Sequence, residues 1–424
     1  MQVAFHTLGC RLNQSETSIL AQAFKEQGYS VVEDQENVDV CVVNTCTVTS
    51  VSDSKCRNSI RKVIRQNPKA KVAVIGCYAE SGFKALSEIE GVDLIVGNQE
   101  KLNLLHYLPE EKLENSRIVK DKIKKTPFEI DSIGQSTSRI RANLKIQDGC
   151  DFMCSFCIIP FVRGRARGRV FENLMNEAKQ LVKQGFKELI LTGVNIGTYD
   201  VEGKTIVDVC DALNELDLPR VRISSIEPTT VDNALLERMA DPHHNLVPYL
   251  HLPLQSGSDH VLTAMKRRYL RKDYLDFVKL AHQKVPHLSI GTDVLLGSPE
   301  ESVEHFEETV SLLRDHSLDY AHAFTYSVRE GTPDEKKEQV SFDERKRRTQ
   351  IIRDLSLNKK MQMGSRYLGQ TVEVLFEELN EGFWQGYTDH YLRVKIKSEL
   401  DLHNQIKNVT VTEVCGDWVL GALI

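Results

Sequence analysis

Three closely spaced cysteines carry the clearest chemical signal in the sequence. Cys150, Cys154 and Cys157 have Cx3Cx2C spacing, directly after a run typical of a buried strand. Three thiolates in one tight loop can hold three irons of a cubane iron–sulfur cluster, so that the fourth iron keeps an open position for a substrate or cofactor. A structural zinc site is the alternative, but such sites usually combine paired CxxC motifs with a fourth ligand. We therefore predict an iron–sulfur cluster with an open iron.

Three further cysteines are far apart in the sequence but follow equivalent elements. Cys10, Cys46 and Cys77 each stand at the end of an apolar, strand-like run and before a helical pattern. Because the carboxyl ends of parallel strands share one edge of a sheet, we expect the three thiols to converge there. Helix N-termini at this edge would favour an anionic thiolate cluster. Three unrelated buried thiols are the alternative, since free cysteine is commonly buried.

The other four cysteines have no spacing typical of ligands, and we interpret them as structural. Cys41 precedes Cys46 by an odd number of residues on one predicted strand, which points the two side chains to opposite faces. Cys56 and Cys210 fall on predicted helices, and Cys415 falls on a predicted strand.

Polar turns that contain or adjoin glycine follow several later strands. Asn195, Ser225 and Gln255 lie in three of these turns, and we expect them to line one pocket above the Cys150 loop. The run 163–169 beside that loop has arginine at every second position. Charge runs are usually solvated, but this position favours contacts with phosphate groups. Residues 266–272 form a second basic segment near the same rim.

The positions of these residues depend on stretches with different periodicity. Residues 1–108 alternate strand-like and helical runs, which predicts an α/β domain with a small doubly wound parallel sheet. Residues 109–138 have no sustained period and predict a linker. Residues 139–363 contain six further β/α units, which predict a partial (β/α)6 barrel and a charged helix over Phe342–Lys360. Residues 364–424 contain strands alone and predict an antiparallel β-barrel of the OB-like kind.

The expected elements follow from these patterns. The strands of residues 1–108 are Gln2–Thr7, Asp39–Asn44, Lys71–Ile75 and Asp93–Val96, and the helices are Asn13–Gln27, Ser54–Gln66, Glu80–Glu88 and Glu100–Tyr107. The barrel strands of residues 139–363 are Ala142–Gln147, Glu188–Thr192, Val221–Ile226, Pro248–Leu252, Ser289–Leu296 and Ala321–Tyr326. The last domain has Thr371–Glu377, Gly382–Thr388, Tyr391–Ile396 and Val409–Leu423, with aromatic residues that could stack on bases or pack a core: Phe383, Trp384, Tyr387 and Tyr391.

Composition limits the classes of protein to consider. The chain has 424 residues, of which 41% are hydrophobic and 27% charged, so that a wholly disordered or fibrous protein is excluded. Its net charge of −6 means that RNA would have to meet local basic patches. No apolar run approaches the ~18 residues of a membrane helix, and the chain begins directly in a strand-like run. We predict a cytoplasmic protein without a membrane partner, whose ten cysteines serve metal binding or catalysis rather than disulfides.

Taken together, these motifs resemble the radical S-adenosylmethionine (SAM) methylthiotransferases. The Cx3Cx2C loop at Cys150 is similar to the radical SAM signature, the Cys10, Cys46 and Cys77 trio precedes it, and a TRAM-like β-barrel follows it. The resemblance covers nearly the whole chain. The runs Thr7–Asn13 and Asn44–Thr49 are most similar to the branch that acts on N6-threonylcarbamoyladenosine in tRNA.

The resemblance implies cofactors and roles. Cys150, Cys154 and Cys157 would hold a [4Fe-4S] cluster that binds SAM through its open iron, with Asn195, Ser225 and Gln255 as further SAM contacts. A 5′-deoxyadenosyl radical would remove hydrogen from carbon 2 of the modified adenosine next to the anticodon. A second [4Fe-4S] cluster on Cys10, Cys46 and Cys77 would hold the sulfur to be transferred, and a second SAM would supply the methyl group. The implied partners are tRNA and a flavodoxin- or ferredoxin-like electron donor.

Two alternatives stay open. One is the branch that acts on N6-isopentenyladenosine in tRNA. The other is a non-enzymatic iron–sulfur protein that binds RNA, although a purely structural cluster gains nothing from an open iron. The branch that modifies an aspartate of a ribosomal protein fits the arginine-rich run and the Leu254–Gly257 turn poorly. The enzyme hypothesis also predicts that the two cysteine trios face each other across one shared cavity.

Overall fold

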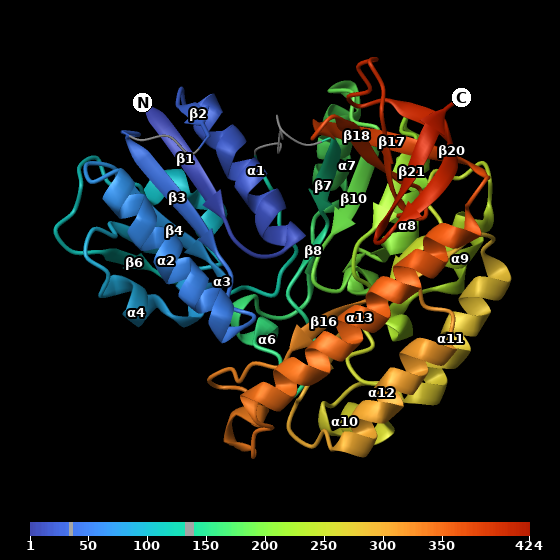
Figure 1. Cartoon of the computed structure of the whole chain (residues 1–424). Helices are drawn as coiled ribbons and strands as arrows, with labels where there is room; N and C mark the ends of the chain where they lie inside the picture. Colours follow the sequence, from blue (N-terminus) through green and yellow to red (C-terminus); the bar gives the residue numbers. More distant parts are fainter. Residues whose placement is uncertain (34–36, 132–139) are drawn as a thin grey trace.

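The computed structural model describes residues 1–33, 37–131 and 140–424, and Figure 1 shows three parts that follow one another along the chain. A layered sheet domain comes first, a curved α/β domain second and a small β-barrel last. Helix α1 (Arg11–Glu26) lies between the first two parts (Figure 1). Across this junction, Ser15 Oγ donates a hydrogen bond of 3.2 Å to the carbonyl of Asn143.

The first domain is a parallel sheet of six strands in the order β2-β1-β3-β4-β5-β6. The central strands β3 (Val40–Thr45) and β4 (Lys71–Gly76) are buried along their whole length. Apolar side chains therefore point to both faces, and both faces need helices. Side chains of α1 pack on one face and those of α2 (Ser50–Gln66) on the other. The remaining elements are β1 (Gln2–Thr7), β2 (Ser30–Val32), β5 (Leu94–Val96), β6 (Arg117–Val119), α3 (Cys77–Ser81), α4 (Phe83–Ser87), η1 (Lys101–Asn103) and α5 (Leu104–Tyr107).

The doubly wound sheet is confirmed, with differences at its edges. Strands β2 and β6, of three residues each, were not predicted, and β6 falls in the stretch predicted as a linker. The predicted helix Glu80–Glu88 is divided into α3 and α4 at Gly82, which ends one helix and precedes the next. The predicted boundary between residues 138 and 139 lies outside the described residues.

The second domain is a curved sheet of six parallel strands. It consists of two three-stranded sheets, ordered β13-β10-β7 and β14-β15-β16, which single bridges join at Val221 with Leu246 and at Ser225 with His251. No ladder joins β7 to β16 within the described residues, so the predicted partial barrel is confirmed. The strands are β7 (Arg141–Lys145), β10 (Glu188–Thr192), β13 (Arg220–Ile223), β14 (Tyr249–His251), β15 (Ser289–Leu296) and β16 (Tyr320–Thr325).

Helices cover the convex side of this sheet, and short elements form its rim (Figure 1). These helices are α7 (Phe171–Lys183), α8 (Ile206–Asn214), α9 (Asn233–Ala240), α10 (Asp259–Ala264), α11 (Arg271–Lys284) and α12 (Val303–Asp315), whereas α6 (Ile159–Val162) packs against α3 of the first domain. The 3-10 turns are η2 (Ile196–Thr198), η3 (Pro228–Thr230) and η4 (Pro333–Lys336). Two short strand pairs are β8 (Gln147–Asp148) with β9 (Arg167–Gly168), and β11 (Asp200–Val201) with β12 (Lys204–Thr205).

A long helix connects the second domain to the barrel. Helix α13 (Phe342–Arg366) extends beyond the predicted end at Lys360 and packs along β16, where Ser356 Oγ accepts a hydrogen bond from the backbone of Ala321. The barrel closes in the order β17-β18-β19-β21-β20. Its strands are β17 (Thr371–Asn380), β18 (Phe383–Thr388), β19 (Arg393–Ile396), β20 (Ile406–Cys415) and β21 (Trp418–Leu423).

The predicted C-terminal β-barrel is confirmed, but it has five strands rather than the four predicted, and one pair of strands is not antiparallel. Strands β19 and β21 pair in parallel, because this topology closes the barrel between the third and fifth strands, whereas the other pairs are antiparallel. The predicted strand Val409–Leu423 is a hairpin, since the turn at Gly416 has φ of 72°. Among the described residues, no helix combines the length and the apolar character needed to span a bilayer.

Candidate active site

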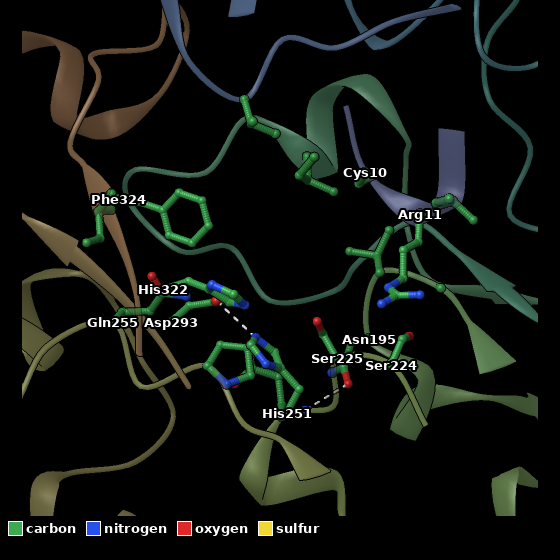
Figure 2. Close-up of a pocket in the computed structure, with 18 of the residues that line it drawn as sticks. Cys10, Arg11, Asn195, Ser224, Ser225, His251, Gln255, Asp293, His322 and Phe324 are labelled. Carbon is green, nitrogen blue, oxygen red and sulfur yellow. Dashed lines mark hydrogen bonds and ion pairs between the residues drawn. The ribbon is translucent and has the colours of Figure 1, made fainter. Parts of the chain in front are cut away.

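A cavity of about 810 Å³ lies where the three parts meet. Cys10 and Arg11 reach it from the first domain, the Cys150 loop and the ends of the barrel strands from the second, and Tyr391 from the third. Figure 2 shows Cys10 and Arg11 on one side of the cavity and His251, Asp293 and His322 on the opposite side. A volume of this size suits a small-molecule cofactor together with part of a substrate.

The three thiols of the Cys150 loop all line this cavity. The backbone N–H of Phe152 donates to Cys150 Sγ at 3.4 Å, and Arg267 Nη1 donates to Cys154 Sγ at 3.4 Å. Burial raises the pKa of Cys150 to about 11 and that of Cys157 to about 12, with a contribution from the charge of Cys154 in both cases. Converging thiols of this kind become thiolates when a metal binds them, so the donor set fits an iron–sulfur cluster.

The dispersed trio also converges. Cys10 is the N-cap of α1, Cys46 follows β3 and Cys77 begins α3, so all three stand at one edge of the sheet as predicted. Burial raises the pKa of Cys46 to about 12, and the charges of Cys77 and Cys10 add to this rise. Cys46 and Cys77 are buried, whereas Cys10 is exposed to the cavity. The two trios therefore meet at one cavity, with Cys10 as the thiol that lines it from the first domain.

Buried charges behind the dispersed trio fit an anionic cluster. Glu16 forms ion pairs with Lys101 at 2.6 Å, Lys145 at 2.7 Å and Arg163 at 3.0 Å. Burial raises the pKa of Cys77, while Arg163 and Lys101 oppose that rise, so both cations lie close to this thiol. The network has four cations and two carboxylates, which leaves positive charge that thiolates can balance. Its members are Glu16, Lys101, Lys145, Asp148, Arg163 and Arg167.

The arginine run 163–169 is therefore not the phosphate-binding surface that the sequence suggested. Arg163 and Arg169 are each 1% exposed, because their guanidinium groups pair with carboxylates inside the protein. Arg167 pairs with Asp148 at 3.3 Å, and Arg165 is the exposed member. In the second basic segment, Arg267 is buried beside Glu227.

The three predicted cofactor contacts all line the cavity. Asn195 Oδ1 accepts a hydrogen bond from Thr230 Oγ1 at 3.2 Å, but its Nδ2 is buried without a partner among the described residues. Ser224 Oγ, which was not predicted as a contact, is also buried without a partner among the described residues. Gln255 has φ of 72° and its N–H donates to the carbonyl of Asp293 at 2.8 Å. Unpartnered polar atoms and left-handed backbone are typical of ligand-binding sites.

Sequence reasoning missed the polar group on the opposite side of the cavity. His251 Nε2 and Asp293 Oδ1 are 2.9 Å apart, and the ring of His322 lies 5.5 Å from that of His251. Their ligand atoms lie within 4.8 Å of one another, a grouping that could hold a metal ion. Burial and the neighbouring His251 lower the pKa of His322. The three residues come from β14, β15 and β16, one from each strand.

The aromatic residues of the barrel lie in two different places, and stacking on bases stays a prediction. Trp384 belongs to the core of the barrel. Tyr387 and Tyr391 line the cavity and stack on each other with ring centroids 4.9 Å apart. Tyr391 also lies 4.9 Å from Tyr249 of β14. The barrel thus contributes to the wall of the cavity.

Comparison with known proteins assigns the family. Residues 2–97 match the family described as "Uncharacterized protein family UPF0004", and residues 144–313 match the Radical SAM superfamily. The chain is 37% identical to the threonylcarbamoyladenosine tRNA methylthiotransferase MtaB of Bacillus subtilis, over 96% of this chain and 93% of that protein. The chain belongs to the radical SAM tRNA methylthiotransferase family. The resemblance drawn from the cysteine motifs is confirmed.

Other relatives agree with this assignment. The chain is 32% identical to the tRNA-2-methylthio-N(6)-dimethylallyladenosine synthase of Geobacillus kaustophilus, over 99% of this chain and 81% of that protein. The radical SAM methyltransferase TsrM of Kitasatospora setae has the same fold with a TM-score of 0.56, 16% identity, and coverage of 79% of this chain and 75% of TsrM. The protein is an enzyme whose family uses SAM and two [4Fe-4S] clusters, which confirms the predicted cofactors.

Proposed function

We propose that this tRNA methylthiotransferase acts on N6-threonylcarbamoyladenosine next to the anticodon and replaces the hydrogen on carbon 2 with a methylthio group. The observation that carries the proposal is that both cysteine trios meet at one cavity, which the Cys150 loop and Cys10 line together. The relatives named MtaB, at 34–37% identity, support the threonylcarbamoyl branch over the dimethylallyl branch at 32%.

Different residues of the cavity have different roles in this proposal. We assign one [4Fe-4S] cluster to Cys150, Cys154 and Cys157 and the other to Cys10, Cys46 and Cys77; when bound, the clusters and SAM supply the radical and sulfur chemistry. Asn195 Nδ2, Ser224 Oγ, Ser225 and Gln255 offer hydrogen bonds that orient SAM above the Cys150 loop. The apolar and aromatic walls exclude water from a reactive radical.

A reaction with defined RNA tests this proposal. The anaerobically reconstituted enzyme receives SAM, a reductant and anticodon stem-loops that carry either N6-threonylcarbamoyladenosine or N6-isopentenyladenosine, and mass spectrometry of the nucleosides identifies the product. We expect methylthiolation of the first RNA. Modification of the second alone would assign the enzyme to the other branch, and absence of methylthiolated product with both would contradict the proposal. A flavodoxin- or ferredoxin-like electron donor and a cytoplasmic location stay predictions.

A further inference from the structure

Three arginines lie around the side chain of Tyr391. Arg11 Nη2 donates a hydrogen bond of 2.6 Å to Tyr391 Oη, and the guanidinium groups of Arg141 and Arg222 lie 5.7 Å and 5.0 Å from the centre of the Tyr391 ring. Burial would raise the pKa of Tyr391, but Arg11, Arg141 and Arg222 together lower it. The site around Tyr391 Oη therefore has a positive potential that stabilises a negative charge.

The three arginines differ in how their charges are balanced. Arg222 pairs with Glu188 at 2.6 Å, and Arg141 pairs with Glu377 and lies 3.9 Å from Glu188. No carboxylate of the described residues lies within ion-pair distance of Arg11. Arg11 thus brings a positive charge to the cavity wall that the described part of the protein does not neutralise. An uncompensated guanidinium in a partly buried site favours an anionic ligand.

The position of this cation relative to the sulfur site is also defined. Arg11 directly follows Cys10, and Figure 2 shows both on the same side of the cavity. Tyr391 is held between Tyr387 and Tyr249, so its hydroxyl group has a fixed position. In adenosine, carbon 2 and carbon 6, which carries the N6 substituent, are both bonded to N1 and lie on the same edge of the six-membered ring. A base whose carbon 2 approaches Cys10 can therefore place a substituent of several atoms within reach of the Arg11 side chain.

We infer that Arg11 and Tyr391 bind the carboxylate of the threonylcarbamoyl group and thereby select a tRNA base with an acidic N6 substituent. This inference rests on the proposed function. Arg11 still has N–H groups to donate, and the Tyr391 hydroxyl can donate its own hydrogen, so one carboxylate can receive hydrogen bonds from both. An isopentenyl group would leave the guanidinium without a counter-charge, which is the kind of loss that gives strong discrimination.

The test compares one charged and one neutral substrate. Anticodon stem-loops carry N6-threonylcarbamoyladenosine either as the free acid or as its carboxamide, and kcat/KM is measured with the reconstituted holoenzyme. We expect wild type to prefer the acid, and Arg11→Gln to lower kcat/KM for the acid about 10- to 100-fold and kcat/KM for the carboxamide by a much smaller factor. Tyr391→Phe should lower the value for the acid about 3- to 10-fold, and Arg11→Lys should restore part of the preference.

A matched variant separates charge recognition from general effects on the cavity. Arg393 also lines the cavity, but its guanidinium donates to Gln385 Oε1 at 2.8 Å, and among the described residues it forms no side-chain hydrogen bond with Tyr391. Arg393→Gln should change kcat/KM for the acid and for the carboxamide by the same factor, so that the preference for the acid stays. Iron content and reductive SAM cleavage show whether each variant holds its clusters. If Arg11→Gln loses its clusters, Tyr391→Phe provides the test instead.

Two results would overturn the inference and leave the proposed function intact. One is a wild-type enzyme that modifies the acid and the carboxamide equally well. The other is an Arg11→Gln enzyme that keeps the wild-type preference, or that loses activity on both substrates equally while its iron content is normal. A wild-type enzyme that modifies neither RNA would contradict the proposed function itself.

Discussion

The two cysteine trios are built in opposite ways. The Cys150 loop brings three thiols together within eight residues, and all three belong to the second domain. The dispersed trio takes one cysteine from each of three strand ends, and a buried charge network that includes residues of the second domain lies behind it. The first site is therefore local in sequence, whereas the second depends on the packing of two domains against each other.

The largest effects should come from removing one cysteine of each trio in turn. Cys154→Ala should remove both reductive SAM cleavage and methylthiolation, because SAM would lose its cluster. Cys46→Ala should keep SAM cleavage but remove product formation, because only the sulfur site is lost. Iron should fall from about eight to about four per chain in each variant, measured after anaerobic reconstitution. SAM cleavage that disappears with Cys46→Ala alone would contradict the division of roles.

The next largest effect should come from the charge network behind the dispersed trio. Glu16→Gln removes the carboxylate that Lys101, Lys145 and Arg163 share and leaves Asp148 as the remaining carboxylate of the network, and we expect a loss of about 3–5 kcal/mol in the free energy of unfolding. Iron should be lost from the dispersed trio before the Cys150 loop. Urea unfolding and iron analysis measure both, with Glu26→Gln at the exposed end of α1 as the control.

The same network predicts a pH dependence. Although burial alone would raise the pKa of Glu16, Arg163, Lys101 and Lys145 lower it well below its usual range. The stabilisation is therefore complete above the unfolded pKa of about 4.3 and is lost as the pH falls below it. Wild type should lose this part of its stability on acidification, whereas Glu16→Gln should lack it at every pH. Parallel acid-unfolding curves for the two proteins would argue against the assignment.

A smaller effect is expected where SAM contacts the second domain. Ser224→Ala removes a hydroxyl group that lines the cavity and has no partner in the described protein, so we expect about 3- to 10-fold weaker SAM binding without loss of stability. Ser298 is a matched control, because its hydroxyl group is equally buried and unpartnered but does not line the cavity. Calorimetric titration with SAM compares the two, and equal affinities would show that Ser224 does not contact the cofactor.

The smallest effect should come from the cysteine beside the dispersed trio. Cys56 Sγ lies 3.4 Å from both the backbone nitrogen and the carbonyl oxygen of Cys46, although the sequence marked it as structural. We expect Cys56→Ala to keep about eight irons and to lose about 1 kcal/mol of stability, since a small buried side chain is removed. A loss of four irons would make Cys56 a ligand and would change the comparison between the trios.

The sequence predicted the two trios because each follows a general rule. Spacing alone defined the Cys150 loop, and the common edge of parallel strands brought Cys10, Cys46 and Cys77 together. Burial of Arg163 was not predictable, because its partners Glu16 and Asp148 come from different domains. The same holds for Tyr391, whose contacts with Arg11 and Tyr249 exist only after the barrel has docked. No local sequence motif marks the polar group of His251, Asp293 and His322. Each of these residues lies on a different strand, and its side chain points into the cavity.

The most direct test of two clusters at one cavity is iron anomalous scattering from anaerobic crystals of the reconstituted protein. The account predicts two separate iron peaks, one bound by Cys150, Cys154 and Cys157 and one bound by Cys10, Cys46 and Cys77, both next to the cavity. A single peak at the Cys150 loop, or a second peak away from the edge where β1, β3 and β4 end, would contradict it.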